Sequence, residues 1–254
     1  MLKILLSGCN GTMGQVIKNF VVNYKELKIV AGFDKEPEKY DNGFPVFNIL
    51  KECEEKADVI IDFSHFSAFE EVVDFAQTKR IPLVMATTGL SEKNEDQLVE
   101  LSKLIPVFRT ANMSLGLNVI LDLVRKASKV LAETFDIEII EKHHNKKVDA
   151  PSGTALMLAE SIDESLGGKM NFVFGRHSKE DRRNKNDIGI HAIRAGSIVG
   201  EHSVLYGGID ELVEIKHTAL SKNIFAGGAI KAAKYIACKE SGYFNMEKLL
   251  EDNQ

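Results

Sequence analysis

Residues 141–155 concentrate side chains that can bind an anion and move a proton. The segment reads EKHHNKKVDAPSGTA and places His143 beside His144, shortly before Lys147. An imidazole can act as a general acid or base near neutral pH, and a lysine offers a positive charge to a carboxylate. Neighbouring side chains on an extended chain point to opposite faces, so the two histidines are poorly placed to share a metal ion, and no metal site is expected. The segment predicts proton transfer on a small anionic substrate.

Two predicted elements position this segment. The alternating, isoleucine-rich run at 135–140 predicts a strand that leads into the histidines, and the sequence PSGTALMLA at 151–159 predicts a turn into a helix. The first turn of that helix would offer backbone N–H groups and the positive end of its dipole to a carboxylate or phosphate. A capped helix and solvated lysines are each common without a ligand, so only their coincidence favours a binding site.

A glycine-rich turn near the N-terminus predicts a dinucleotide site. An apolar strand at 2–6 runs into SGCNGTMG at 7–14 and then into helical periodicity. Glycines in such a turn allow a tight bend and a close approach of the backbone to a pyrophosphate. Asn10 stands where the G-x-G-x-x-G pattern has its second glycine, so a plain strand-to-helix connection is the alternative.

The next strand ends in an acidic residue that suits a ribose. Asp34 follows the apolar run at 27–33, where a carboxylate can bind the adenosine ribose hydroxyls and favour NADH. Lys35 follows at once and could bind the 2′-phosphate of NADPH, although a solvated lysine is an equal alternative. NADH or NADPH is therefore the expected cofactor.

Apolar runs and helical patterns alternate through the rest of the first half, at 57–63, 69–78, 82–86, 91–104, 105–108 and 115–131. This order predicts a parallel sheet, which binds ligands beyond the carboxyl ends of its strands. The residues expected to bind the cofactor are Gly8, Cys9, Asn10, Gly11, Thr12, Met13, Asp34, Lys35, Ala86, Thr87, Thr88, Thr110, Ala111, Asn112 and Met113.

The second half has a different pattern. Runs at 188–194, 198–206 and 210–217 are separated by glycine turns and predict a mixed, mainly antiparallel sheet. The charged loop at 176–187 is expected to be solvated, with an active-site lid as the alternative. A helical pattern at 223–239 carries apolar residues that would pack back onto the first domain.

These patterns predict an α/β protein with two domains. A Rossmann dinucleotide-binding domain would comprise residues 1–112 and 223–254, and an α+β domain would comprise residues 113–222 and bind substrate.

Composition excludes several other classes. The chain has 254 residues, 44% of them hydrophobic, with a net charge of −5. This lack of a basic excess argues against nucleic acid or an anionic membrane as partner. No apolar run approaches the ~20 residues of a membrane span. Three cysteines without a C-x-x-C pair, and no recognisable secretory signal, favour free thiols in a reducing cytoplasm.

Taken together, these segments resemble the 4-hydroxy-tetrahydrodipicolinate reductase family, formerly called dihydrodipicolinate reductases. The resemblance covers nearly the whole chain, and its most specific part is HHNKKVDAPSGTA at 143–155. Supporting segments are Gly8 to Gly14, ATTG at 86–89, Ala111-Asn112, RAG at 194–196, GEH at 200–202 and FAGGA at 225–229.

The resemblance implies an activity and a role for each residue of the histidine segment. The family reduces 4-hydroxy-tetrahydrodipicolinate to tetrahydrodipicolinate with NAD(P)H and loss of water, in lysine biosynthesis via diaminopimelate. His143 would be the proton donor, and Lys147 a second proton donor or a carboxylate clamp. The substrate-binding residues would be His144, Ser152, Gly153 and Thr154. A homotetramer built by the sheet of the second domain is also implied.

Departures from the family pattern are few. Ala86 stands where the family usually has glycine, Lys222 where many members have arginine, and Met113 where an aromatic residue is frequent. Two other functions stay open: another two-domain NAD(P)-dependent imine or semialdehyde reductase, and a non-catalytic NAD(P)-binding regulator.

Overall fold

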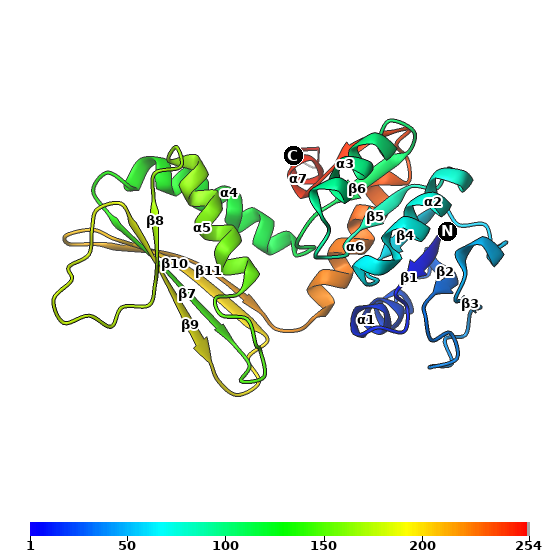
Figure 1. The fold of residues 1–254 in the computed structure, drawn as a ribbon, viewed down its shortest axis with the longest axis horizontal. Coiled ribbons are helices and arrows are strands. Elements are labelled where there is room, and N and C mark those ends of the chain that lie inside the picture. The colour runs from blue at the N-terminus through cyan, green and yellow to red at the C-terminus, as the bar shows by residue number, and fades with distance from the viewer. Residues whose placement is uncertain (253–254) are drawn as a thin grey trace. The chain divides into compact units, whose positions relative to one another are not determined.

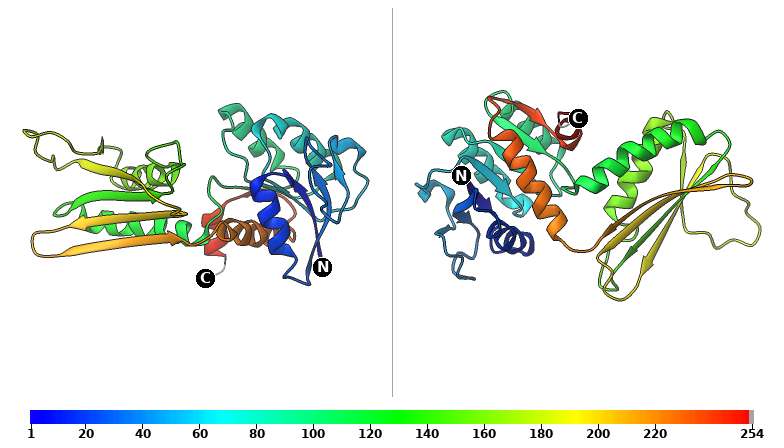
Figure 2. Two further views of the ribbon diagram at one scale, coloured as in Figure 1. Left: turned by 90° about the horizontal axis from the view of Figure 1, so that it is seen from below. Right: turned by 180° about the vertical axis from the view of Figure 1, so that it is seen from behind.

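The computed structural model describes residues 1–252, which fall into two compact units (Figures 1 and 2). Unit 1 comprises Met1–Leu115 with the segment from Lys222 onward, and unit 2 comprises Gly116–Ser221. The second domain expected from the sequence begins at 113, against 116 for unit 2, and ends at 222, against 221. In the described part, no helix has the length and hydropathy needed to cross a membrane.

Unit 1 is built on a parallel sheet with strand order β12-β6-β5-β4-β1-β2-β3. Its strands are β1 (Leu2–Ser7), β2 (Leu27–Phe33), β3 (Val46–Phe47), β4 (Val59–Asp62), β5 (Leu83–Met85), β6 (Pro106–Arg109) and β12 (Gly242–Phe244). Neighbouring strands in it pair in parallel, which confirms the predicted parallel sheet. The short strands β3 and β12 had no counterpart in the sequence prediction, because runs of two or three residues show no periodicity.

Helices cover both faces of this sheet. They are α1 (Thr12–Val21), α2 (Phe69–Lys79), α3 (Glu92–Leu101), α6 (Asn223–Ile236) and α7 (Met246–Glu251), with the 3₁₀ turns η1 (Leu50–Glu52) and η2 (Phe66–Ala68). Ile4 and Leu6 of β1 pack in one cluster with α1, α6 and α7, whereas Leu5 between them packs with α2 and α3. A strand buried on both faces needs apolar residues in succession, which explains the continuous apolar run of β1.

Unit 2 is a five-stranded sheet with two helices on one face (Figure 1). The strands are β7 (Asp136–His143), β8 (Asn171–Phe174), β9 (Asp187–Arg194), β10 (Gly200–Gly207) and β11 (Leu212–Ala219), and the helices are α4 (Leu115–Leu131) and α5 (Gly153–Ser165). Alternate residues of β7, such as Ile137 and Ile139, are fully or nearly fully buried in the core with these helices. Glu138, between them, points to the opposite face and is half-buried.

The order of the second sheet corrects one prediction. The strands lie in the order β11-β10-β7-β9-β8, with two antiparallel pairings and two parallel ones, so the sheet is mixed but not mainly antiparallel. The segment 195–199 does not close a hairpin, because β7 lies between β9 and β10. It crosses the end of β7, where the Ala195 N–H donates to the His143 carbonyl at 2.9 Å. Glycine turns alone do not distinguish a hairpin from such a crossing.

Candidate active site and dinucleotide site

The turn after β1 has the geometry that a dinucleotide needs. Gly8 has φ of +74°, and a Cβ there would lie 2.6 Å from the Phe63 carbonyl oxygen. A Cβ at Gly14 would lie 2.5 Å from the Cys9 carbonyl oxygen, so α1 and the turn approach as closely as glycine permits. Gly11 is the N-cap of α1 and gives no side-chain cap. The first turn of α1 can therefore receive a phosphate at its backbone N–H groups.

Asn10 explains how the turn tolerates a side chain at the second glycine position. Its side chain is buried and donates from Nδ2 to the Glu36 carbonyl at 2.6 Å. Its Oδ1 accepts from Nδ2 of Asn42 at 2.8 Å, and its backbone N–H donates to Asp34 at 2.9 Å. The Asn10 side chain thus binds the segment after β2, while the Asn10 backbone N–H holds the carboxylate of Asp34 next to the turn.

A cavity of about 380 Å³ adjoins this turn. It is lined by Gly8, Asn10, Gly11, Phe33, Asp34, Lys35, Glu36, Lys39, Phe63, Ser64, His65 and Ala68. Asp34 accepts from the Glu36 N–H at 3.2 Å, and Nζ of Lys35 donates to Oγ of Ser67 at 2.9 Å. The cavity therefore offers a carboxylate for ribose hydroxyls and a cation nearby, a donor set that fits the adenosine part of NADH or NADPH.

A buried carboxylate ties the strand ends of unit 1 together. Asp62, at the end of β4, is fully buried and accepts from Oγ of Ser7 at 2.5 Å and from Oγ1 of Thr87 at 2.6 Å. Arg109, at the end of β6, donates to the Thr87 carbonyl at 2.9 Å. The segment after β5, where cofactor contacts were predicted, is therefore rigidly held at the carboxyl edge of the sheet.

The remaining residues predicted to bind the cofactor differ in how far they are exposed to solvent. Cys9 and Met113 are buried, and burial raises the pKa of the Cys9 thiol to about 12. These two can offer a cofactor only main-chain atoms. Ala86 and Thr87 are buried at the sheet edge, Thr110 and Asn112 are half-buried, Met13 is half-buried on α1, and Thr12, Thr88 and Ala111 are exposed.

In unit 2, β7 ends at His143 and presents this ring beside a buried carboxylate. Oε2 of Glu141 lies 2.6 Å from Nδ1 of His143, and the Glu141 side chain is fully buried. Arg194 on the neighbouring strand β9 donates to both carboxylate oxygens, at 2.7 and 2.8 Å. Burial alone would raise the pKa of Glu141, but the hydrogen bonds from Arg194, His143 and the Ser152 N–H lower it overall. Glu141 is therefore an ionised group inside the unit.

The start of α5 lies against the same carboxylate. Ser152 is the N-cap of α5, and its hydroxyl accepts from the Ala155 N–H at 3.2 Å. The Ser152 N–H donates to Oε1 of Glu141 at 3.0 Å, so this N–H is occupied within the protein and only part of the predicted free N–H set is available. Gly153 begins α5 with open space around it, since a Cβ there would meet no atom within 4 Å. A ligand carboxylate can therefore approach the backbone at Gly153.

His202 on β10 completes the cluster. Its Nε2 lies 2.9 Å from Oγ of Ser152, and its ring lies edge-on to that of His143, with centroids 5.1 Å apart. Burial, followed by the charge of His143, lowers the pKa of His202 to about 4. His202 is therefore neutral at physiological pH and serves as a hydrogen-bond partner of the N-cap.

The other predicted substrate residues lie on the segment between β7 and α5. Nδ1 of His144 is buried and has no hydrogen-bond partner among the described residues. Nζ of Lys147 pairs with Asp149 at 2.7 Å, and Thr154 lies in the first turn of α5. His143, His144, Lys147, Ser152, Gly153 and Thr154 thus all lie on one continuous stretch around the start of α5. Residues 1–252 contain no group of three or more histidine, cysteine or acidic side chains placed to hold a metal ion.

The sequence prediction gave no role to Glu141, Arg194 or His202. A signal for Glu141 was present, because residues two apart on a strand share a face, and Glu141 precedes His143 by two. Nothing local in the sequence pairs Arg194 with Glu141, which lie 53 residues apart.

Comparisons with known proteins cover the whole chain. The N-terminal family model of dihydrodipicolinate reductase matches residues 2–113, and the C-terminal model matches residues 116–250. A 4-hydroxy-tetrahydrodipicolinate reductase of Caldanaerobacter subterraneus is 49% identical over 99% of both chains. One of Clostridium tetani is 47% identical over 98% of this chain and 97% of its own.

Solved structures share the fold. A dipicolinate-bound dihydrodipicolinate reductase from Paenisporosarcina sp. TG-14 superposes with a TM-score of 0.82 at 22% identity, covering 98% of this chain and 99% of that one. An amine dehydrogenase from Mycobacterium smegmatis reaches 0.65 at 9% identity, over 97% and 95% of the two chains. On its two family models and its close relatives, the chain belongs to the dihydrodipicolinate reductase family.

Proposed function

We propose that this protein reduces 4-hydroxy-tetrahydrodipicolinate to tetrahydrodipicolinate with NADH or NADPH and loss of water, in the diaminopimelate route to lysine. The observation that carries the proposal is the cluster of His143, Glu141 and Ser152, which places a held imidazole beside the start of α5. Relatives that are 47% and 49% identical bear the name of this activity.

The dinucleotide site belongs to unit 1. The turn from Gly8 to Gly11 and the uncapped start of α1 would hold the pyrophosphate, and Asp34 would bind the ribose hydroxyls. The bound cofactor supplies the hydride. Asp62 and Arg109 keep the segment at Thr87 in place, so that this edge of the sheet is preorganised.

We expect both cofactors to bind, because Asp34 suits NADH while Lys35 offers a charge to the 2′-phosphate of NADPH. The apparent Kd values of the two, measured by quenching of NAD(P)H fluorescence, should agree within about tenfold, since a single exposed cation contributes about 1 kcal/mol. Replacing Lys35 with Gln should weaken NADPH alone. A hundredfold gap between the cofactors in the unaltered protein would contradict this.

The substrate site belongs to unit 2. The dipicolinate in the Paenisporosarcina structure is a small dicarboxylate, which supports the same chemical class of ligand here. Lys147 and His144 would bind one carboxylate, and the open backbone at Gly153 with Ser152 and Thr154 would bind the other. Fixing both carboxylates orients the ring between them.

His143 is the proton donor of the proposed reaction. A carbon that receives hydride needs a proton on its neighbour, and an imidazole can deliver one near neutral pH. The net reaction consumes one proton and releases one water. Lys147 is the second candidate for a proton donor, although its ion pair with Asp149 suits a carboxylate clamp better.

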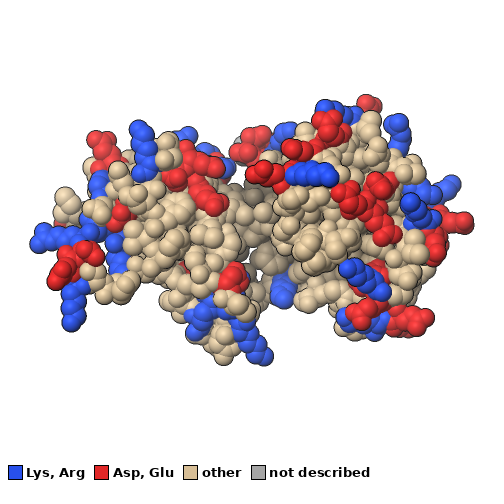
Figure 3. All heavy atoms as spheres, in the orientation of Figure 1, with Lys and Arg blue, Asp and Glu red and all other residues tan. Residues whose placement is uncertain are grey.

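A homotetramer built on the sheet of unit 2, in the cytoplasm, is the assembly we expect. The face of that sheet opposite α4 and α5 carries the charged pairs of Lys142 and Lys216 with Glu201. Basic and acidic side chains are also interspersed over the surface that Figure 3 shows. Light scattering of the purified protein during size-exclusion chromatography tests the tetramer.

The deciding experiment follows NADH and NADPH oxidation while a dihydrodipicolinate synthase makes the substrate from pyruvate and aspartate semialdehyde. Oxidation should require the synthase and both of its substrates. Omitting each component in turn separates this activity from that of a reductase acting on aspartate semialdehyde itself. A folded protein that binds NAD(P)H but oxidises none under any condition would overturn the proposal and favour a non-catalytic regulator.

A further inference from the structure

We propose that Glu141 is a positioning residue, which fixes the tautomer of His143 and thereby assigns the transferable proton to Nε2. The inference rests on the proposed function, because His143 is a proton donor only if the protein is the reductase.

The Glu141 carboxylate has four polar contacts, two at each oxygen. Oε1 accepts from Nη2 of Arg194 at 2.7 Å and from the Ser152 N–H at 3.0 Å. Oε2 accepts from Nη1 of Arg194 at 2.8 Å and lies 2.6 Å from Nδ1 of His143. Arginine and a backbone N–H can only donate, so three of the four bonds need an oxygen that accepts.

The hydrogen between Glu141 and His143 belongs to the imidazole. The carboxylate is fully buried, paired with a guanidinium and ionised, so it has no proton to give to Nδ1. Nδ1 must therefore carry the hydrogen, both in the neutral and in the cationic ring. A proton that leaves His143 can leave only from Nε2.

Nε2 of His143 lies beside Gly200 on β10. A Cβ at Gly200 would lie 3.1 Å from Nε2 of His143 and 3.5 Å from its Cδ2. Glycine at this position on β10 therefore keeps the space beside Nε2 clear. His202 lies two residues further along β10. Its Nε2 contacts Oγ of Ser152, and the ring is neutral at physiological pH.

The segment 195–199, which crosses the end of β7, binds the backbone on both sides of His144. The Ala195 N–H donates to the His143 carbonyl at 2.9 Å, and the Asn145 N–H donates to the Gly196 carbonyl at 3.2 Å. Nη2 of Arg194 also donates to the Asp149 carbonyl at 2.6 Å. The backbone of His143, the guanidinium and the segment before α5 are thus fixed together. Turning the ring over would put Cδ2 in the place of Nδ1 and lose the contact with Glu141.

A double-mutant cycle tests the proposal in the full-length protein, with E141Q, H143A and the double variant. An amide at 141 can place its NH₂ group against Nδ1 and so stabilise the wrong tautomer. We expect E141Q to lower kcat about a hundredfold and to raise the solvent deuterium isotope effect on kcat, with the substrate KM changed less than threefold. In the H143A background, E141Q should change kcat less than threefold. Equal losses in both backgrounds, or an unchanged isotope effect, would overturn the proposal.

Three measurements keep the test interpretable. NADH fluorescence quenching, dipicolinate binding by calorimetry and the circular dichroism spectrum should match those of the unaltered protein in E141Q. The matched control is E138Q, which alters another glutamate of β7 that is paired with a histidine and arginines, but on the opposite face of the sheet. Its kcat should stay within twofold of the unaltered protein.

If E141Q does not fold, G200A decides. Its methyl group would meet Nε2 of His143 at 3.1 Å, so kcat should fall at least tenfold while NADH binding is unchanged. An unaltered kcat in G200A overturns the assignment of Nε2. Failure of the proposed function is distinguishable, because the unaltered protein would then show no synthase-dependent oxidation at all.

Discussion

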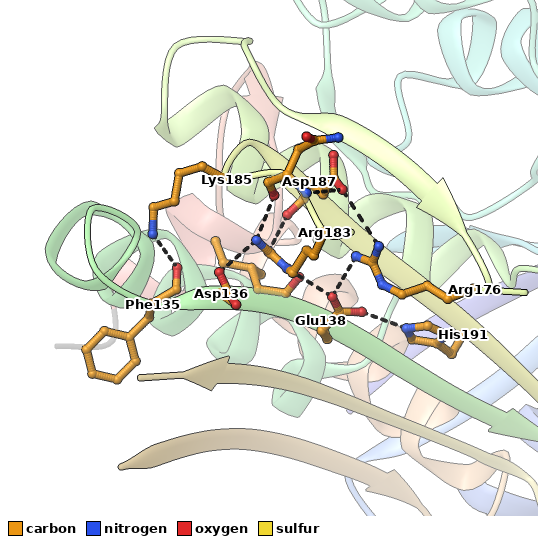
Figure 4. Close-up of polar contacts among 10 residues, drawn as sticks. Phe135, Asp136, Glu138, Arg176, Arg183, Lys185, Asp187 and His191 are labelled. Carbon is orange, nitrogen blue, oxygen red and sulfur yellow. Dashed lines mark hydrogen bonds and ion pairs between the residues drawn. The ribbon is translucent and has the colours of Figure 1, made fainter. Parts of the chain in front are cut away.

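Strand β7 carries two clusters of the same residue types, one on each face of the sheet. On the helix-covered face, Glu141 binds Nδ1 of His143 and the guanidinium of Arg194. On the other face, Glu138 binds Nε2 of His191 at 2.6 Å and accepts from Arg176 and Arg183 (Figure 4). Chemical composition alone would give the two clusters the same function.

Burial and the choice of ring nitrogen separate them. The Glu141 side chain is fully buried, whereas that of Glu138 is 24% exposed. His143 keeps Nε2 free of the carboxylate and faces the space at Gly200, but His191 uses Nε2 to bind Glu138. The proposed proton donor is a held ring, and His143 is held through Nδ1 by a fully buried carboxylate, whereas His191 is held through Nε2 by a partly exposed one.

The cluster on Glu138 has a structural role instead. Arg176 and Arg183 belong to the loop between β8 and β9, and Arg183 also donates to the carbonyl of Asp187 at 2.6 Å. Gly189 leaves the space that the Glu138 carboxylate fills. The loop predicted to be solvated at 176–187 is largely exposed, but Arg176 and Arg183 tie it to β7.

Removing the imidazole of each cluster in turn should separate the two clusters most clearly. H143A should lower kcat by a hundredfold or more, because general acid catalysis contributes about 10²–10⁴ in rate. H191A should leave kcat within twofold, since its ring only completes the Glu138 cluster. Synthase-coupled NADH oxidation measures both, with NADH and dipicolinate binding as controls. A loss below tenfold in H143A at unchanged binding would remove His143 as the donor.

His202, which lies in the Glu141 cluster, should make the stability of the protein depend on pH. The pKa of His202 is lowered to about 4 in the fold from 6.5, so the unfolded chain binds more protons between these values. The free energy of unfolding is therefore not reduced by His202 above about pH 6.5, and it falls as the pH drops from 6.5 toward 4. Between pH 7 and pH 5 the loss should be about 2 kcal/mol.

The change can be read as a lower Tm at pH 5. Replacing His202 with Gln should reduce the difference in Tm between the two pH values, because the His202 ring is buried as a neutral group. Equal pH dependence in the unaltered protein and H202Q would refute this assignment.

The smallest effect should come from Glu138. E138Q removes the negative charge from a partly exposed cluster, and ion pairs of this kind contribute about 1 kcal/mol. We expect Tm to fall by a few degrees and proteolysis to quicken within the loop at 176–186, while kcat stays within twofold. Protease cleavage followed by mass spectrometry locates the loosened segment. Undiminished protection of the loop would show that the arginines do not need Glu138.

Much of the fold was predictable because its elements have long, regular patterns. Helix α4 occupies Leu115–Leu131, as predicted, and the parallel sheet of unit 1 follows from alternating apolar runs and helical stretches. Strand β12 was not predicted, because it is only three residues long. It pairs with β6 and forms one edge of the sheet of unit 1. The predicted strand at 135–140 continues to His143, because pairing with β9 and β10 extends it past its apolar part.

By itself, the sequence determined the local chemistry of this protein: a glycine turn before a helix, an acid after β2, and a histidine just before the helix capped by Ser152. These features depend on neighbours a few residues apart. Tertiary structure alone decided which charges meet, because β7 lies between β9 and β10 and brings Arg194 to a carboxylate 53 residues away. It also decided which glutamate of β7 is buried, because α4 and α5 cover only the face of the strand that carries Glu141.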